Sequence, residues 1–140
     1  MDLGRHQGRP RVPGAAEAVI LLDTNAIIWL LQRHRRARVL ADRVRLHMSP
    51  VSLLELQMLV EAGRLEHQGG RTVASVAADP RWKLDEPPAG RWFEQTVEIG
   101  WTRDPFDRLL VAHARLRGWK LATGDRALLE RLPASACLPL

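Results

Sequence analysis

Five carboxylates in this sequence lie just after an expected strand or in the first turns of an expected helix. They are Asp23, Glu55, Asp104, Asp107 and Asp125. Carboxylate oxygens such as these, with no cysteine or histidine ligand among them, favour the binding of Mg²⁺ or Mn²⁺ over that of zinc. Such ions stabilise charge on phosphate groups and activate water. These acids are therefore the candidate metal ligands of the chain.

Other residue types that bind metals or act as nucleophiles do not form a competing site. The five histidines are scattered without ligand spacing, and no glycine-rich phosphate loop or serine nucleophile elbow is present. Cys137 is the only cysteine, which excludes an internal disulfide framework and a cysteine-only zinc site. We expect it to be a small buried core residue.

The elements expected to position the acids alternate between strands and helices. A buried strand over 18–22 ends just before Asp23, and a strand over 119–123 ends shortly before Asp125. Glu55 lies in a helix that opens at Ser49 and Pro50, and Asp104 opens a helix that Gly118 closes. Alternation of this kind predicts an α/β domain with a mainly parallel sheet, whose ligand site lies beyond the carboxyl ends of the strands.

The rest of the chain is expected to complete this domain. Further helices are predicted over 26–32, 38–46, 71–78, 91–98 and 125–131, and further strands near 47–48, 82–84 and 136–138. Gly69 and Gly70 mark a break. Residues 1–17 are rich in glycine, proline and arginine, so we expect a flexible basic tail followed by a single domain over 18–140.

Each acid also has a purely structural explanation. Asp23, Asp104 and Asp125 are placed to cap helices, and Ser52 and Glu55 have the spacing of a capping box. Capping does not explain why all of them should meet at one edge of the sheet. Two carboxylates ~4 Å apart repel by about 4 kcal/mol at an effective dielectric constant near 20. A cluster of them therefore requires a counter-ion.

The charge of the chain favours a polyanionic partner. Lysine and arginine total 21 against 16 acidic residues, and the whole excess of five lies within residues 1–45. Nineteen of the 21 are arginine, so genomic base composition is an alternative explanation for the excess. Arg103, Arg108 and the cluster containing Arg33, Arg35 and Arg36 are the candidates to hold an RNA backbone. No segment has the pattern of a membrane span or a secretory signal, so we expect a cytoplasmic protein with no membrane partner.

Four blocks of this sequence resemble those of PIN-domain nucleases, and most closely the VapC-like toxins of type II toxin–antitoxin pairs. The blocks are LLDTN at 21–25, SPVSLLE at 49–55, RDPFDRLL at 103–110 and LATGD at 121–125. The resemblance extends over about 18–140. It departs from the family at Gly124, where the family is variable, and in the length of the tail before residue 18.

The resemblance implies a three-layer α/β/α fold around a mainly parallel sheet and a Mg²⁺-dependent endoribonuclease, with Mn²⁺ as a possible substitute. It implies that four acids, here named the acidic quartet, are catalytic and bind the metal: Asp23, Glu55, Asp107 and Asp125. Our hypothesis is that the three aspartates bind one ion and that Glu55 positions a second ion or the attacking water. Auxiliary roles fall to Asp104 and to the side chains expected to hold the quartet in place, namely Thr24, Asn25, Ser52 and Thr123.

The resemblance also implies RNA as the substrate and a small VapB-like antitoxin that inserts an arginine near the acids. Apolar residues early in the chain, Ile27, Ile28, Trp29 and Leu31, are expected to form part of a homodimer or antitoxin surface. Two related alternatives stay open, an RNA-processing PIN nuclease without an antitoxin and a non-catalytic nucleic-acid or protein binding module. A receiver domain is disfavoured because position 25 is Asn and the only lysines are Lys83 and Lys120.

Overall fold

A parallel five-stranded sheet organises the chain in a computed structural model that describes residues 18–43, 45–66 and 71–140. The expected tail over 1–17 and the expected break at Gly69 and Gly70 lie outside these residues. The strands are β1 (Ile20–Leu22), β2 (Leu46–Met48), β3 (Lys83–Leu84), β4 (Lys120–Thr123) and β5 (Cys137–Pro139).

The strand order is β3-β2-β1-β4-β5, and every neighbouring pair is parallel. In the middle of the sheet Leu21 of β1 lies in register with His47 of β2 on one side and Leu121 of β4 on the other. The chain therefore leaves the central strand β1 in one direction and returns on its other side with β4. In sheets with such a reversal the ligand site lies beyond the carboxyl ends of the strands, and Asp23 directly follows the carboxyl end of β1.

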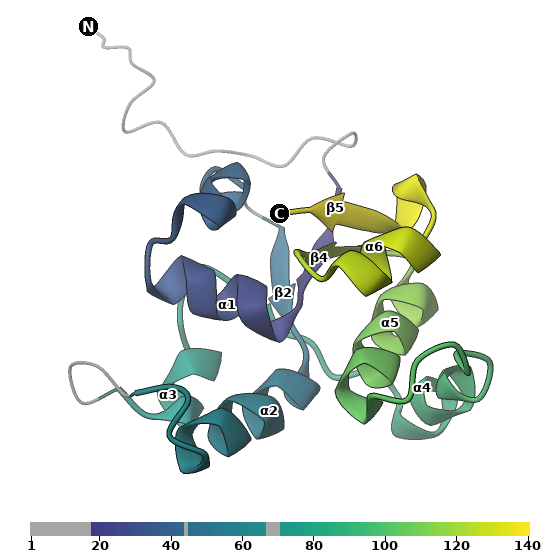
Figure 1. The fold of residues 1–140 in the computed structure, drawn as a ribbon, viewed down its shortest axis with the longest axis horizontal. Helices are drawn as coiled ribbons and strands as arrows, with labels where there is room; N and C mark the ends of the chain where they lie inside the picture. The colour runs from purple at the N-terminus through teal and green to yellow at the C-terminus, as the bar shows by residue number, and fades with distance from the viewer. Residues whose placement is uncertain (1–17, 44, 67–70) are drawn as a thin grey trace, which may run out of the picture.

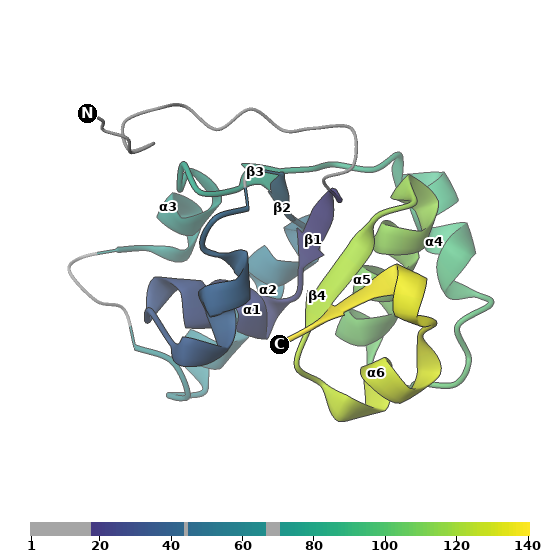
Figure 2. The ribbon, with the colours of Figure 1, turned by 90° about the horizontal axis from the view of Figure 1, so that it is seen from above.

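Helices cover both faces of the sheet. They are α1 (Thr24–Leu31), the 3₁₀ helix η1 (Arg35–Leu40), α2 (Pro50–Glu61), α3 (Val73–Ala77), α4 (Ala89–Thr96), α5 (Pro105–Arg117), α6 (Arg126–Arg131) and the 3₁₀ turn η2 (Ala134–Ala136). Figure 2 shows α1 and α3 on one side of the strands and α4 and α5 on the other. The predicted three-layer α/β/α fold is confirmed. None of the described helices is long and apolar enough to cross a membrane.

Alternation along β1 divides the hydrophobic core between the two faces. Ile20 and Leu22 are fully buried against α1, η1 and α3, whereas Leu21 is fully buried against α4 and α5. Ile27 of α1 is also fully buried, so the expectation that it belongs to a partner surface is wrong. Cys137 is buried, as expected.

The predicted helix over 38–46 is wrong. The chain instead forms η1 and then enters β2 at Leu46. Ala37 and Leu40 are the buried residues of η1, three positions apart, which matches the three-residue repeat of a 3₁₀ helix. Val39, which the prediction placed inside, is 47% exposed.

The other predicted elements are present with shifted ends. The helix expected over 26–32 begins earlier, at Thr24, because Asp23 caps it. The helices expected over 71–78 and 91–98 are α3 and α4, and the three strands expected near 82–84, 119–123 and 136–138 are β3, β4 and β5.

Candidate functional site

Three of the predicted acids cap helices that start at the carboxyl edge of the sheet. Asp23 accepts a hydrogen bond from the backbone N–H of Ala26 at 2.7 Å, and Asp125 accepts one from that of Leu128 at 3.2 Å. Asp104 accepts two such bonds at the start of α5. These contacts confirm the capping explanation for all three. They also anchor the carboxylates of Asp23 and Asp125 just beyond the carboxyl ends of β1 and β4.

Glu55 does not take part in a capping box, and that prediction is wrong. Ser49 is the residue that caps α2, because Pro50 occupies the first helical position. Ser52 is instead fully buried, and its hydroxyl lies 3.0 Å from the hydroxyl of Thr24. The Thr24 hydroxyl donates a hydrogen bond to Glu55 Oε1. Thr24, in contact with Ser52, therefore fixes the side chain of Glu55 across two helices.

The starts of α1, α2 and α5 face one another across the middle of the molecule (Figure 1), which brings the acids of separate helices within electrostatic reach. The effect is largest at Asp107, in the first turn of α5. Burial raises the pKa of its carboxyl to about 7, and the negative charges of Asp104, Asp125, Glu55 and Asp23 add to the increase. The charges of Asp104 and of the other three quartet members therefore act on Asp107, although no three of the described carboxylates form a ready metal site.

The pKa values of Asp23 and Glu55 are also raised, by burial and by the charges of neighbouring acids. Burial raises the pKa of Asp23 to about 6, and the hydroxyl of Thr123 opposes this increase by donating a hydrogen bond to the carboxylate. Burial also raises the pKa of Glu55, which the bond from Thr24 opposes. Thr123 therefore lies against Asp23, whereas the side chain of Asn25 is exposed.

The donor set fits a hard divalent cation. No arginine or lysine in the described part of the chain forms an ion pair with a quartet carboxylate. Among the described residues, no three Asp, Glu, His or Cys side chains are grouped closely enough to hold a metal ion as they stand. The quartet is thus an uncompensated group of carboxylates, held by helix ends and hydroxyls, whose mutual repulsion a divalent cation would relieve.

This repulsion predicts that the metal-free protein loses stability as the pH rises. The unfolded aspartates release their protons near pH 4, whereas folded Asp23 and Asp107 hold theirs to about pH 6 and 7. The folded state therefore binds more protons across this window, and the free energy of unfolding should fall as the pH rises through it and then level off above about pH 7. Chemical denaturation in EDTA at a series of pH values measures it.

Two controls accompany that titration. His113 produces the opposite slope, because burial lowers its pKa, so the comparison of wild type with Asp107→Asn isolates the contribution of the acid. Mg²⁺ should restore the lost stability of the wild type above about pH 7. A wild type and an Asp107→Asn variant with the same pH profile would contradict the assignment.

The predicted RNA-contacting arginines are divided between different places. Arg103 is exposed at the start of α5, beside the acids in sequence. Arg108 donates from Nε to the backbone carbonyl of Thr102 at 2.7 Å, which fixes its guanidinium near the same helix start. Arg35 is exposed on η1, and Arg33 lies at the far end of α1.

Of these arginines, Arg36 contacts the residues that are most distant from it in the sequence. Its guanidinium stacks over the ring of Trp29 at 4.4 Å and donates to the backbone carbonyls of Leu140 and Gly124, at 3.0 and 3.5 Å. Gly124 directly precedes Asp125, so this contact lies beside the acidic quartet.

The same contact explains the glycine at position 124. A Cβ atom there would lie 2.7 Å from both Trp29 Cη2 and Arg36 Nη2. We therefore expect Gly124→Ala to displace the Trp29 ring and lower the free energy of unfolding by about 1–3 kcal/mol. Urea denaturation measures the loss. The double variant with Trp29→Leu, which removes the obstructing ring, should recover part of it, and an undiminished loss would contradict the steric explanation.

A buried polar group on the other face of the sheet escaped the sequence prediction. Fully buried His113 lies 2.7 Å from Asp85 through Nε2, and Arg117 binds the same carboxylate at 2.9 and 3.1 Å. Asp85 follows β3 whereas the other two lie on α5, 28 or more positions away, so no local spacing signals the contact. Their position against the core indicates a structural role.

Comparisons with known proteins agree with this architecture. The family model described as PIN domain matches residues 20–134. Among solved structures, a toxin–antitoxin complex from Klebsiella pneumoniae is similar at 19% identity and a TM-score of 0.63, covering 85% of this chain and 95% of that one. A DNA-bound VapBC from Salmonella typhimurium is similar at 22% identity and a TM-score of 0.59, and the match covers 87% of this chain and 98% of that one.

A third structure, PAE2754 from Pyrobaculum aerophilum, is similar at 24% identity and a TM-score of 0.60, covering 90% of this chain and 92% of that one. At these identities the structural likenesses establish the fold alone. No curated protein matches the sequence. The family model, by contrast, spans most of the chain, including every member of the acidic quartet. The chain therefore belongs to the PIN-domain family.

Proposed function

We propose that this protein is a metal-dependent endoribonuclease and the toxin of a type II toxin–antitoxin pair. The observation that carries the proposal is the mutual electrostatic effect of four carboxylates beyond the carboxyl ends of the strands, which have no cationic partner among the described residues. Membership of the PIN-domain family, whose members are typically nucleases, supports the same activity.

The residues proposed to hold the cation are Asp23, Asp107 and Asp125, with Glu55 completing the group. Mg²⁺ is the proposed ion and Mn²⁺ its substitute, because all the donors are hard oxygens. When bound, such an ion supplies Lewis-acid stabilisation of charge on a phosphate and lowers the pKa of water.

The protein's own contribution is to keep these carboxylates oriented and ionised. Thr123 donates to Asp23 and stabilises its charged form, and Thr24 does the same for Glu55. Backbone N–H groups at the starts of α1 and α6 bind Asp23 and Asp125 and add the favourable end of each helix dipole. Asp104 serves as the cap of α5 and so holds the first turn of the helix, which carries Asp107.

Arginines near the start of α5 are proposed to bind the phosphates that flank the bond to be cut. Arg103 is exposed beside the acids, and Arg108 is held by Thr102 at the same helix start. Guanidinium groups bind phosphate oxygens in pairs, which orients an RNA strand without reading its sequence.

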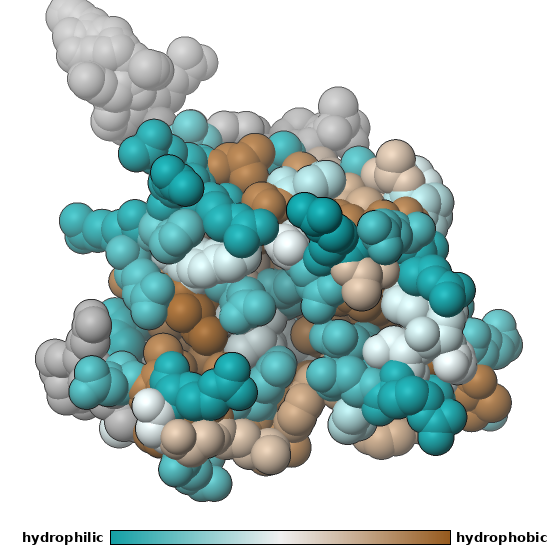
Figure 3. All heavy atoms as spheres, viewed as in Figure 1, coloured by the Kyte–Doolittle hydropathy of each residue, from teal (hydrophilic) through white to brown (hydrophobic). Residues whose placement is uncertain are grey.

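An antitoxin is the proposed occupant of an apolar cavity beside α1. The cavity has a volume of about 300 Å³, and its walls include Ile28, Leu31, Val60 and Val73. Figure 3 shows apolar residues gathered over α1, with hydrophilic residues around them. The similar proteins from Klebsiella and Salmonella were solved as toxin–antitoxin complexes, which supports a protein partner of that class here. The homodimer remains a prediction, to be tested by light scattering at high concentration.

RNA cleavage by the purified protein, freed of any partner, tests the proposal. Labelled RNA should be cut in Mg²⁺ or Mn²⁺ and left intact in EDTA, and co-expression with a small neighbouring reading frame should suppress the cutting. Cutting that no such partner suppresses would favour an RNA-processing nuclease. A protein that binds neither metal nor RNA would contradict the nuclease proposal.

A further inference from the structure

A second cavity of about 300 Å³ lies at the far end of α1, and its rim is basic. Arg33, His34, Arg38, Arg43 and Arg81 line it, and no acidic residue among the described ones does. Its floor consists of apolar side chains from α1, η1 and β2. We name these five rim residues and the space they enclose the basic pocket.

The connection after α1 builds the pocket. Arg33 has a φ of 55°, in the left-handed region that residues other than glycine seldom adopt. This reversal turns the chain back over α1, and the ring nitrogen Nδ1 of His34 then caps η1 by accepting from the backbone N–H of Arg36. Ala37 and Leu40 are buried beneath, so the arginines of this segment are left at the surface. Figure 3 shows the strongly hydrophilic surface over η1.

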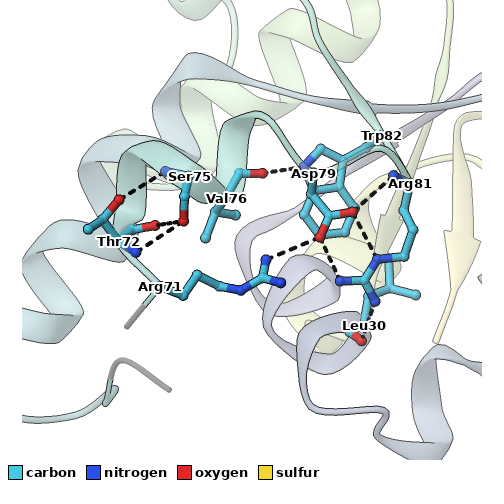
Figure 4. Close-up of polar contacts among 8 residues, drawn as sticks. All are labelled: Leu30, Arg71, Thr72, Ser75, Val76, Asp79, Arg81 and Trp82. Carbon is cyan, nitrogen blue, oxygen red and sulfur yellow. Dashed lines mark hydrogen bonds and ion pairs between the residues drawn. The ribbon is translucent and has the colours of Figure 1, made fainter. Parts of the chain in front are cut away.

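One wall of the pocket is fixed by an ion pair. Arg81 binds Asp79 through Nε and Nη2, at 3.0 and 2.7 Å, and donates from Nη1 to the carbonyl of Leu30 at 2.9 Å (Figure 4). Arg71 binds the same carboxylate from the other side at 3.2 Å. The charge of Arg81 is therefore compensated, and its guanidinium serves as a rigid side of the cavity.

The other three arginines are not compensated. Within the described residues, no carboxylate forms an ion pair with Arg33, Arg38 or Arg43. His34 adds a donor, because its Nδ1 accepts a bond and Nε2 then carries the proton of the neutral ring. Three such guanidiniums around a concave space attract an anion with several oxygens, and phosphate matches their paired donors.

The pocket and the acidic quartet lie at opposite ends of α1. Asp23 caps the start of this helix, and Leu30, in its last turn, contributes to the pocket. Eight residues of helix span about 12 Å, so a phosphate in the pocket is out of reach of the quartet. Arg36, on η1 between Arg33 and Arg38 in sequence, reaches the backbone next to Asp125. Arg36 is therefore a basic side chain that connects the segment of the pocket with the backbone beside Asp125.

We propose that the basic pocket binds a phosphate of the RNA backbone several nucleotides from the bond that is cut. The choice of RNA as the ligand rests on the proposed function. The pocket holds the distant part of the strand, and Arg36 marks the path toward the quartet. A substrate long enough to reach both places then gains affinity that a short one does not.

The test removes two of the uncompensated charges. Arg33→Asn keeps a residue that tolerates positive φ, and Arg38→Gln keeps the length of the side chain. The matched control is Arg91→Gln with Arg115→Gln, which removes two exposed arginines from outside the pocket. Both pairs are made in an Asp107→Asn background so that labelled RNA stays intact, and equal melting temperatures establish that both fold.

Fluorescence anisotropy should show about tenfold weaker binding of long RNA by the pocket variant. The slope of log K against log salt should fall in magnitude by about 0.7, because the pocket neutralises one phosphate of a single strand. The control pair should change both values much less. In the cleavage-competent background, the pocket variant should raise KM more for long RNA than for short oligonucleotides.

The outcomes separate this proposal from the one on which it rests. Cleavage by the wild type, with equal binding of long RNA by pocket and control variants, would overturn the pocket and leave the nuclease standing. A wild type that neither binds nor cuts any RNA would overturn both. Titration with inorganic phosphate distinguishes the sources of the anion: loss of phosphate binding in the pocket variant with unchanged RNA affinity would overturn RNA as the ligand.

Discussion

Asp107→Asn should slow metal-dependent RNA cleavage by at least about a thousandfold while making the metal-free protein more stable. The first effect corresponds to about 4 kcal/mol of transition-state stabilisation, which is within what a metal ligand supplies. The second follows because the pKa of Asp107 is raised to about 7, by burial and by four neighbouring acids. Removing that charge should add about 2 kcal/mol to the free energy of unfolding at pH 8 in EDTA.

Opposite changes in activity and stability distinguish a site carboxylate from a structural one. Asp104→Asn is the matched control, because asparagine also caps helices and the cap at the start of α5 is retained. It should lower the rate by less than about tenfold. Cleavage rates under single-turnover conditions and urea denaturation in EDTA provide the two readouts. An Asp107→Asn variant that cuts RNA at the wild-type rate would remove Asp107 from the quartet.

Asp23→Asn should lose activity to a similar extent, since Asp23 is also buried and has a raised pKa. Its stability should change less than that of Asp107→Asn. Asparagine can still accept the bond from Ala26, and the bond from Thr123 that stabilises the charged carboxylate is no longer needed.

The positions of these acids could be predicted because each is tied to a local signal. A run of apolar residues before Asp23, and Pro105 after Asp104, mark an element end and a helix start in the sequence itself. Parallel strands then place such ends at one edge. The four sequence blocks added Glu55, which no strand end identifies.

Contacts between distant segments could not be predicted in this way. Ser52 and Glu55 have capping-box spacing, yet Ser52 is turned toward Thr24, 28 residues earlier, because α2 packs against α1. The basic residues show the same limit. The composition predicted a positive charge in the first third of the chain. It could not predict that the backbone reversal at Arg33 places Arg36 beside the quartet and leaves Arg33 and Arg38 in the basic pocket.

The largest effect on stability is expected at Asp79, which no motif singled out. Its side chain is 4% exposed, and both carboxylate oxygens are bonded, to Arg81 and Arg71. The Arg81 guanidinium holds the pKa of Asp79 well below its usual range. Asp79→Ala should therefore lower the free energy of unfolding by about 3 kcal/mol at neutral pH, because it leaves Arg81 without its partner beside the core.

The loss should depend on pH in a defined direction. A carboxylate with a depressed pKa stabilises the fold above the pKa of the unfolded chain, so the difference between wild type and Asp79→Ala should be constant above about pH 5 and shrink in acid. Asp42→Ala, at an exposed aspartate, is the control and should change stability by less than about 0.5 kcal/mol.

Arg71→Ala separates the two cations bound to Asp79. Arg71 makes one bond and is 43% exposed, so its removal should lower the free energy of unfolding by less than about 1 kcal/mol. Arg81, by contrast, makes paired bonds to Asp79 and ties the segment before β3 to the end of α1 through Leu30. If Asp79→Ala destabilises no more than Arg71→Ala at neutral pH, Arg81 does not depend on Asp79 for its position, and the rigid wall of the basic pocket must have another cause.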